Sequence, residues 1–431
     1  MPSRLKWVLL ALLAFVAGHP QRCEGVLPHL RVGLLQRQPE IAFSGPAGVT
    51  VQPLRGDEVL AWVPPGETWR ARAGPPAALV DAAGAEVAAA GDGLLLLPPE
   101  GGTVTLHGVE GHWDGRTMRD YRGVIEITAR GGGLLAVNLV DVETYLRGVV
   151  PSEMPASYPL AALQAQAVAA RGQVLTKAGR HHSEGFDLCS GQHCQIYGGA
   201  TSEDPRTDQA VASTWGEVLV YRGRLADTLY SSTCGGHTAS NDDYWPGATP
   251  IPYLRGQPDF EPEDGIAYDF PLPEDKLRAY LKYAPAVSCN QPRYGASDKL
   301  RWWLVVPRQE LQKTLTEELG DFGDLLDVRV GERAPSGLVR RLDVIGSRRL
   351  PQARGGPAVR RALGGLNSAS FAVEPYRDQE GLPVAFAIWG AGWGHQVGMC
   401  QVGAAGLADR GWDYQRLLSK YYTGCQIERR Y

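Results

Sequence analysis

Short apolar runs broken by turn residues make up much of the first third of the chain. Runs rich in Leu, Val and Ile alternate with Gly, Pro and Asp over residues 26–133. Runs of this length and spacing are typical of β-strands joined by turns. The strands that we expect here lie at 30–35, 48–51, 93–97, 103–106 and 124–127. The pattern therefore predicts a β-rich N-terminal region over 26–133, with one more strand at 134–139 after it.

A different periodicity begins at Pro159 and continues to Lys177. Apolar residues recur at intervals of three and four, which places them on one face of a helix. These residues are Leu160, Leu163, Ala167, Ala170 and Val174. Proline suits the first position of a helix, and Gly179 suits its exit. We therefore predict one prominent helix over 159–177.

The remaining pattern is mixed. We expect strands at 216–221 and around 225–233, a helix at 308–319, and two strands within 327–345 about a Pro-Ser-Gly turn. The proline-containing acidic stretch 259–275 has no periodicity and predicts a surface loop. The fold class that follows is α+β, mostly β, with one prominent helix.

Composition excludes several classes of protein. The 431 residues include 43 Lys and Arg against 47 Asp and Glu, a net charge of −4 without long single-sign runs. A nucleic-acid binder would show a basic excess, so we expect no nucleic-acid partner. A hydrophobic content of 44% is enough for a sizeable core and excludes disorder as a description of the whole chain.

The first residues predict an export signal. Arg4 and Lys6 precede an apolar run from Trp7 to Ala17, the length of a signal peptide and short of the roughly 20 residues that span a bilayer. We expect a signal peptide over 1–25 and export to the cell envelope, periplasm or exterior, with a membrane anchor only if the segment stays uncleaved. Beyond Cys23, six cysteines remain, which allows disulfides in an exported chain without establishing them. These are Cys189, Cys194, Cys234, Cys289, Cys400 and Cys425.

One carboxylate, Glu153, lies between Pro151 and Pro155 just ahead of the predicted helix. We expect it on a stiffened loop, where a general acid or base could be held in reach of its substrate. Burial against Met154 and Tyr158 would raise its pKa. The alternative is a solvated loop residue that favours a helix N-terminus electrostatically.

A dense group of thiols and imidazoles follows the helix. Its members are His181, His182, Cys189, His193 and Cys194. Such ligands can close a tetrahedral zinc site, and a site made only of protein ligands is structural. The alternative is a Cys189–Cys194 disulfide, or two free thiols near surface histidines.

Two glycine-rich segments, 231–238 and 392–401, carry further candidates. Glycine permits close approach of the backbone to a ligand, and Trp393 could offer a stacking face to a sugar. Cys234, His237, His395 and Cys400 could form a second zinc site. A Cys234–Cys400 disulfide, or simple proximity, is the interpretation that we prefer.

Read in order, these segments resemble a known family. The runs YLRGVVPSEMP, PLAALQAQAVAAR, SSTCGGHT, SGLVRRLDVIG, RRALGG and GWGHQVGMCQVGAAGLA are similar to the stage II sporulation protein D and amidase-enhancer family. The resemblance runs from about Leu134 to Cys425, so we expect a catalytic domain of this type over 134–431.

The resemblance implies a lytic transglycosylase that cleaves peptidoglycan glycan strands without stem peptides. Glu153 matches the catalytic glutamate of the family, and it would act alone as acid and base to leave 1,6-anhydro-muramic ends. The resemblance also implies a structural zinc, which we assign to His182, Cys189, His193 and Cys194. The substrate-binding residues that we assign are Ser152, Arg171, Ser232, Gly235, Gly236, His237, Trp393 and His395.

Two other functions share these motifs. One is a non-catalytic peptidoglycan-binding protein that enhances a cell-wall amidase, which would then be a partner. The other is a zinc amidase, which needs a metal with an open coordination position facing the cleft. The chain departs from the family at Gln396, where a glycine is frequent, and this affects the placement of substrate more than the reaction. A role in sporulation or in general wall remodelling fits equally.

Overall fold

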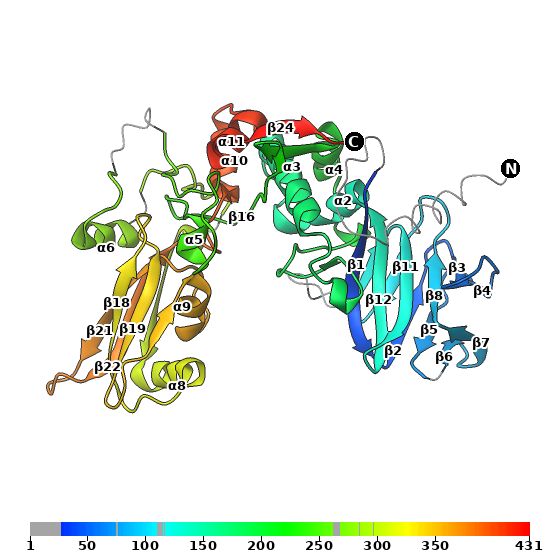
Figure 1. Ribbon diagram of the computed structural model, residues 1–431, viewed down its shortest axis with the longest axis horizontal. Coiled ribbons are helices and arrows are strands. Elements are labelled where there is room, and N and C mark those ends of the chain that lie inside the picture. Colours follow the sequence, from blue (N-terminus) through cyan, green and yellow to red (C-terminus); the bar gives the residue numbers. More distant parts are fainter. Residues whose placement is uncertain are drawn as a thin grey trace.

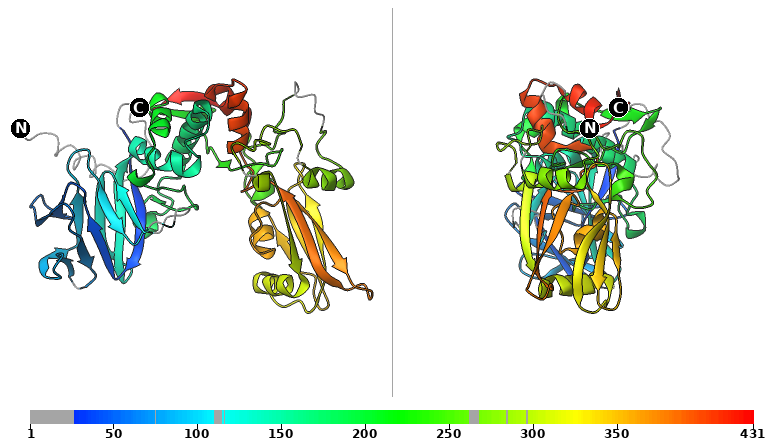
Figure 2. Two further views of the ribbon diagram at one scale, coloured as in Figure 1. Left: turned by 180° about the vertical axis from the view of Figure 1, so that it is seen from behind. Right: turned by 90° about the vertical axis from the view of Figure 1, so that its left-hand side faces the viewer.

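The protein consists of two lobes joined as an arch, in the computed structural model shown in Figure 1. The structure describes residues 27–431 except 75, 110–114, 116, 262–267, 284 and 296. The predicted signal peptide and Cys23 lie outside these residues, as does the middle of the predicted surface loop. Figure 2 shows the same arch from behind and end-on.

The first lobe begins with two antiparallel sheets that share one hydrophobic core. The first sheet has the order β13 (Leu188–Cys189), β1 (His29–Gln38), β12 (Gly133–Asp141), β11 (Val124–Arg130), β8 (Gly93–Leu97), β3 (Val49–Pro53) and β4 (Ala61–Val63), with β13 joining β1 in parallel. The second has the order β10 (Met118–Tyr121), β9 (Val104–His107), β2 (Glu40–Ser44), β5 (Trp69–Arg72), β6 (Ala77–Val80) and β7 (Glu86–Gly91).

The sheets cross the boundary that we expected at residue 133. Strand β1 pairs with β12 from His29–Asp141 to Gln38–Leu134, and the core runs on into the helices that follow. Alternate residues face this core, as Val49 and Val51 do in β3. The five expected runs correspond to β1, β3, β8, β9 and β11, whereas β2, β4 to β7 and β10 were not expected. The β-rich region and the next 100 residues therefore fold around one core.

Helix α3 (Leu160–Lys177) is the centre of the first lobe and confirms the predicted helix. Almost every side chain from Ala162 to Val174 is buried, because the helix is apolar nearly all round. Its small alanine side chains let neighbouring elements approach closely. The elements that pack against it are α2 (Val142–Glu153), α4 (Pro205–Ser213), α10 (Gln401–Asp409), α11 (Tyr414–Tyr421) and β14 (Glu217–Tyr221). Strand β14 pairs with β15 (Arg224–Leu225) on one side and with β24 (Gln426–Arg429) on the other.

The second lobe has a core of its own, centred on residues such as Phe322, Phe371 and Phe386. One antiparallel sheet has the order β17 (Arg301–Pro307), β22 (Pro383–Ala391) and β21 (Phe371–Arg377), and the other β18 (Leu325–Arg333), β19 (Val339–Gly346) and β20 (Gln352–Arg354). Helices α8 (Arg308–Leu319) and α9 (Gly356–Ala362) lie beside them, with α6 (Glu274–Lys282) at the end nearer the arch (Figure 1). The predicted helix at 308–319 and the hairpin within 327–345 are confirmed.

The second lobe is inserted between two short strands of the first. Strand β16 (Tyr230–Ser231) pairs in parallel with β23 (Met399–Cys400), so the chain leaves and returns at the same place. Helices α5 (Asn241–Tyr244) and α7 (Ser297–Leu300) belong to the segment between them. Among the described residues, none of the helices combines the length and the apolar character that crossing a membrane requires.

Candidate active site

Glu153 is the last residue of helix α2, so the prediction of a loop at this position is wrong. Asp141 begins the helix by accepting a hydrogen bond from the Thr144 N–H at 2.9 Å. The helix accommodates Pro151 in its last turn and ends at Met154, whose backbone is extended. The next proline, Pro155, favours that extended conformation in Met154 and stops the helix. Glu153 is therefore held at a helix end by the fold.

The carboxyl of Glu153 is half-buried and has few partners. The backbone N–H of Ile196 donates to its Oε1 at 2.7 Å. Burial raises the pKa of Glu153 to about 7, because it disfavours the charged form, and the Ile196 hydrogen bond only partly offsets this. The alternative of a solvated loop carboxylate is therefore wrong. Glu153 can hold or release a proton near neutral pH.

A buried polar network lies behind Glu153. The side-chain amide of Gln195 donates to the Tyr230 hydroxyl at 3.1 Å and accepts from the Tyr145 hydroxyl at 3.3 Å. On the other side, the Gln401 amide donates to the Glu153 backbone carbonyl at 3.0 Å and to the side-chain oxygen of Gln166 at 3.2 Å. These contacts fix the end of α2 against α3 and α10, which limits how far the carboxyl can move.

The Glu153 side chain lines an open pocket of about 290 Å³. The other lining residues are Pro155, Tyr158, Ser232, Pro292, Arg293, Tyr294, Gly295, Lys299 and Gln401. The rings of Tyr158 and Tyr294 lie 5.0 Å apart between centroids, and the Tyr158 hydroxyl donates to the Tyr294 carbonyl. Among the described lining residues, Glu153 is the one carboxylate and Arg293 and Lys299 are the cations.

The assignment of Arg171 to substrate binding is wrong. Its side chain is 0% exposed and makes two hydrogen bonds to Glu143, at 2.7 and 2.8 Å. A third contact joins it to the Glu217 carbonyl at 3.0 Å. The inward face of α3 thus carries Arg171 into a buried ion pair with α2, where no substrate reaches it.

Several other assigned residues also face away from the pocket. The Ser152 hydroxyl donates to the Gly148 carbonyl within α2 at 2.8 Å. Gly235 and Gly236 have φ of 74° and 111°, and a Cβ on Gly236 would collide with the Tyr280 hydroxyl. His237 is buried, and its Nδ1 contacts the Thr238 carbonyl at 2.6 Å. These four residues shape the backbone and its packing, whereas Ser232 lines the pocket.

Trp393 and His395 lie beside the pocket region on the returning chain. The Lys299 ammonium lies 5.8 Å from the Trp393 ring centroid, which places the ring next to a pocket cation. His395 accepts the Val397 N–H on Nδ1 at 3.0 Å, and burial lowers its pKa to about 3. Its ring packs near Trp245, 5.3 Å between centroids. His395 is therefore a neutral packing residue.

The backbone conformation of Gln396 is one that glycine adopts easily. Its φ is 64°, in the left-handed region that favours glycine. The side chain is buried, and its amide donates to the Cys234 carbonyl at 2.7 Å and to the Ala391 carbonyl at 3.0 Å. Its oxygen accepts from the Ser370 hydroxyl at 2.7 Å. These hydrogen bonds offset the backbone strain and link the two glycine-rich segments to the second lobe.

The structure gathers one histidine-cysteine cluster close to the candidate site. Its members are His181, Cys189, His193 and Cys194, with ligand atoms all within 4.8 Å of one another. His181, and not His182, completes the set: His181 lies just before the 3₁₀ turn His182–Glu184, and the His182 side chain is exposed. The assignment of His182 is therefore wrong. Cys194 lies two residues before Ile196, the hydrogen-bond donor to Glu153.

The geometry of this cluster fits a tetrahedral ion. The Nε2 of His181 lies 3.2 Å from the Nδ1 of His193 and 3.4 Å from the Cys194 sulfur, and His193 lies 3.8 and 3.9 Å from the two sulfurs. Bond lengths at zinc give tetrahedral edges of roughly 3.3 to 3.8 Å for such atoms. Glu184 contacts His181 Nδ1 at 2.5 Å, a carboxylate partner typical of metal-bound histidine.

Cys234 and Cys400 lie together in the glycine-rich segments, which confirms the expected proximity, but both are free thiols and the disulfide is not formed. The Cys234 N–H donates to the Cys400 sulfur at 3.2 Å. The alternative second zinc set is wrong in its histidines, because neither His237 nor His395 joins these cysteines. Asp259 and Cys289 do so instead.

Half of the residues that line the pocket could not be predicted from the sequence. Tyr158 was expected beside Glu153, and Ser232 and Gln401 lie in glycine-rich segments that had been singled out, whereas Pro292, Arg293, Tyr294, Gly295 and Lys299 come from one segment that had not. The segment 291–299 has no periodicity and no chemical motif of its own. Its adjacent Arg293 and Tyr294 are the one signal that could have pointed to it.

Comparisons with known proteins match the part of the chain that holds this site. A family model described as a stage II sporulation protein matches residues 130–221, which include Glu153, α3 and the histidine-cysteine cluster. Stage II sporulation protein D of Bacillus subtilis is 29% identical over 307 residues, covering 68% of this chain and 76% of that protein. Residues 130–221 therefore match the stage II sporulation protein family, and about two thirds of the chain is similar to stage II sporulation protein D and to an amidase enhancer.

Other relatives extend the family assignment. The amidase enhancer of Bacillus subtilis is 28% identical over 302 residues, 65% of this chain but only 40% of that protein. An uncharacterized protein of Brachyspira hyodysenteriae is 26% identical over 317 residues, 73% of this chain and 74% of its own. A family model described as a domain of unknown function matches residues 239–398, which include the second lobe.

Proposed function

We propose that this protein is an exported peptidoglycan lytic transglycosylase that cleaves peptide-stripped glycan strands to 1,6-anhydro-muramic ends. The observation that carries the proposal is the Glu153 carboxyl, with a pKa of about 7, on the wall of a pocket. A general acid is most effective when its pKa lies near the pH of the reaction. The match to the stage II sporulation protein family and the similarity to stage II sporulation protein D support a role at the cell wall and in sporulation.

The reaction begins with Glu153 protonated. The carboxyl donates its proton to the glycosidic oxygen that joins N-acetylmuramic acid to the next sugar, and the bond from that oxygen to the anomeric carbon breaks. An oxocarbenium-like state develops on the muramic ring as the leaving sugar departs with the proton. Glu153 is left as a carboxylate, held in place by the Ile196 N–H.

The same carboxylate completes the reaction. It takes the proton of the muramic 6-hydroxyl, whose oxygen attacks the anomeric carbon and closes the 1,6-anhydro ring. Protons balance, and no water is consumed. The usual two-carboxylate glycosidase needs a second acid to place a water or to act as nucleophile. The presence of one carboxylate among the described pocket residues supports the one-acid route.

The remaining pocket residues suit a glycan without peptides. Tyr158 and Tyr294 offer aromatic surface, which packs well against the apolar face of a sugar ring. Removing a stem peptide leaves the lactyl group of muramic acid as a free carboxylate. Arg293 and Lys299 are cations of the kind that bind such a group. Strands that still carry peptides lack this charge.

We assign a structural zinc to His181, Cys189, His193 and Cys194. Four protein ligands fill a tetrahedral shell, so the ion would have no open position for substrate. Its role would be to hold the segment that carries Ile196 against Glu153. This closed set argues against the zinc amidase. Export, with the first residues as signal peptide or anchor, remains part of the proposal.

The second candidate is a binding protein that stimulates a cell-wall amidase. The relative named amidase enhancer favours it, since that protein is similar over 302 residues. The same pocket would then hold a glycan strand without cutting it, and an amidase would be the partner. A carboxyl buried to a pKa of about 7 favours catalysis instead, because binding alone has no need of it.

The test is digestion of peptide-stripped glycan strands by the purified protein and by Glu153→Gln, with products identified by mass spectrometry. Glu310→Gln, at an exposed site on α8, is the matched control. Anhydro-muramic ends from the wild type and the control alone are the expected result. Reducing ends formed with water would make the protein a hydrolase. Strand binding without cleavage by any variant would favour the enhancer.

A further inference from the structure

Four potential ligands that are far apart in the sequence meet in the interior. They are Cys234, Asp259, Cys289 and Cys400, and their ligand atoms all lie within 4.8 Å of one another. The side chains are at most 2% exposed. Cys234 follows β16, Asp259 and Cys289 come from loops on either side of α6, and Cys400 ends β23. The cluster therefore lies where the second lobe joins the first.

The spacing of these atoms is that of a coordination shell. The sulfurs of Cys234 and Cys289 lie 3.8 Å apart, and the Cys234 sulfur lies 3.3 Å from Oδ2 of Asp259. Zinc bond lengths give tetrahedral edges of about 3.8 Å between two sulfurs and about 3.5 Å between sulfur and oxygen. A disulfide needs about 2.0 Å. The compact set has room for one ion.

The neighbouring groups suit thiolates and a metal-bound carboxylate. Backbone N–H groups point at two sulfurs, from Gly236 to Cys234 at 3.4 Å and from Gly403 to Cys400 at 3.3 Å. The Tyr421 hydroxyl donates to Oδ1 of Asp259 at 2.8 Å, which leaves Oδ2 to face the sulfurs. Among the described residues, Asp259 forms no salt bridge that would compensate its burial. Hydrogen-bonded outer partners of this kind orient metal ligands.

We propose that Cys234, Asp259, Cys289 and Cys400 hold a single zinc ion in a closed structural site. Three soft sulfurs and one oxygen match the ligand preference of zinc, and four protein ligands complete its shell. The ion neutralises charge that would otherwise be buried without compensation. This site is separate from the histidine-cysteine cluster and does not depend on the catalytic proposal.

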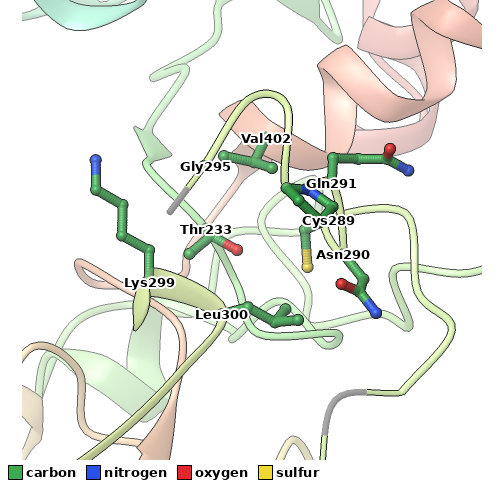
Figure 3. A pocket seen from close by; sticks show the side chains of 9 residues that line it. Thr233, Cys289, Asn290, Gln291, Gly295, Lys299, Leu300 and Val402 are labelled. Atoms are coloured by element: carbon green, nitrogen blue, oxygen red, sulfur yellow. The ribbon is translucent and has the colours of Figure 1, made fainter. Parts of the chain in front are cut away.

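The ion would connect the junction of the lobes to the candidate pocket. Cys400 directly precedes Gln401, which binds the Glu153 carbonyl. Cys289 and Thr233 converge on a small pocket in Figure 3, together with Gly295 and Lys299, which also line the pocket of Glu153. One ion would thus fasten the segment 289–299, the returning chain and the start of α10.

The experiment counts zinc per chain by elemental mass spectrometry in the wild type and in three single variants. Cys289→Ser removes one ligand of the proposed site, Cys189→Ser removes one ligand of the histidine-cysteine cluster, and Cys425→Ser lies outside both. We expect Cys289→Ser to lose one equivalent of zinc and Cys425→Ser to lose none. If the histidine-cysteine cluster binds no zinc, the wild type should contain one equivalent of zinc per chain. That equivalent should be absent from Cys289→Ser and present in Cys189→Ser.

Cobalt substitution provides a second test in case the Cys289→Ser variant does not fold. In the Cys189→Ser chain, cobalt at the proposed site should give the visible bands of a tetrahedral thiolate complex. Asp259→Cys should keep the ion and intensify the sulfur-to-cobalt charge-transfer band, because it adds a fourth thiolate. Zinc content unchanged by Cys289→Ser would overturn the proposal. So would a loss of two alkylatable thiols in the denatured, unreduced wild type, which would mean a disulfide.

Discussion

Two glutamates on helix α2 have opposite environments. Glu143, in the first turn, is 3% exposed and receives both the Arg171 guanidinium and the Tyr431 hydroxyl, each at 2.7 Å. Glu153, at the last turn, faces a pocket and receives a single backbone N–H. The first forms a buried ion pair with Arg171, whereas the second has a pKa of about 7. One helix therefore provides a structural ion pair at one end and a carboxyl with a raised pKa at the other.

The difference shows that burial alone does not predict what a carboxylate does. Burial disfavours the charge of both side chains, and the partners decide the outcome. A guanidinium that binds both oxygens compensates the charge of Glu143, so that residue stabilises the fold. None of the described residues binds Glu153 as a cation in this way, so its proton remains available. Substitutions at the two positions should therefore affect different properties.

Glu153→Gln should have the largest effect, on activity alone. The amide cannot transfer a proton, so we expect the rate of anhydro-product formation to fall by about 10²- to 10⁴-fold. The midpoint of denaturant unfolding should not decrease. Steady-state kinetics and urea unfolding measure the two properties on the same preparation. A destabilised variant would mean that the carboxyl serves the fold, as Glu143 does.

Glu143→Gln should have the next largest effect, on stability. Removing the charge leaves Arg171 buried without compensation, so the free energy of unfolding should fall by about 3 to 5 kcal/mol. Chemical denaturation measures it, with the exposed Glu310→Gln as control. Combining Glu143→Gln with Arg171→Met should cost less than the sum of the two single changes, because no buried charge then lacks a partner. Additive effects would contradict the ion pair.

The pH dependence of stability should distinguish the glutamates further. The pKa of Glu153 is raised in the folded protein, so the folded state binds more protons than the unfolded state between about pH 4.5 and 7. Its contribution to the free energy of unfolding therefore falls as the pH rises through this window. In the wild type this decrease in the free energy of unfolding should be about 1 to 3 kcal/mol, and it should be absent in Glu153→Gln. Parallel stability-pH curves for the wild type and this variant would show that the pKa is not raised.

Arg293→Gln should have the smallest effect. Losing one partly exposed cation should raise KM for peptide-stripped strands by about 3- to 10-fold, with kcat little changed. The KM for strands whose lactyl carboxylates have been amidated chemically should stay the same in both proteins. Arg354→Gln, on β20 in the second lobe, is the control. An equal rise in KM for both substrates would mean that Arg293 shapes the pocket but does not interact with the lactyl carboxylate.

Local patterns in the sequence were sufficient to predict many elements. Helices α3 and α8 and the hairpin β18–β19 each have a complete signal within about 20 residues, namely periodicity, a turn or an end residue. Helix α2 was missed because Gly148 and Pro151 weaken its pattern, while the N-cap at Asp141 and the packing against α3 hold it in shape. Tertiary contacts overrode the local preference.

The candidate site divides in the same way. The histidine-cysteine cluster spans residues 181–194, so its chemistry was visible in the sequence, although the choice of His181 over His182 depended on a turn. The second cluster draws on residues from 234 to 400, and two of its four members were not associated with it. The wrong role for Arg171 has a similar cause, because its partner Glu143 lies on another helix. Contacts between residues that are far apart in the sequence leave no local pattern from which they could be predicted.

The short pairing of β16 with β23 has a consequence for how the protein is made. Helices α10 and α11 pack on α3, and β24 pairs with β14, so the last 30 or so residues complete the first lobe. During synthesis the entire second lobe leaves the ribosome before those residues do. The second lobe, with its own core, is therefore able to fold while the first still waits for its closing segment. The candidate pocket, which includes Gln401, is assembled last.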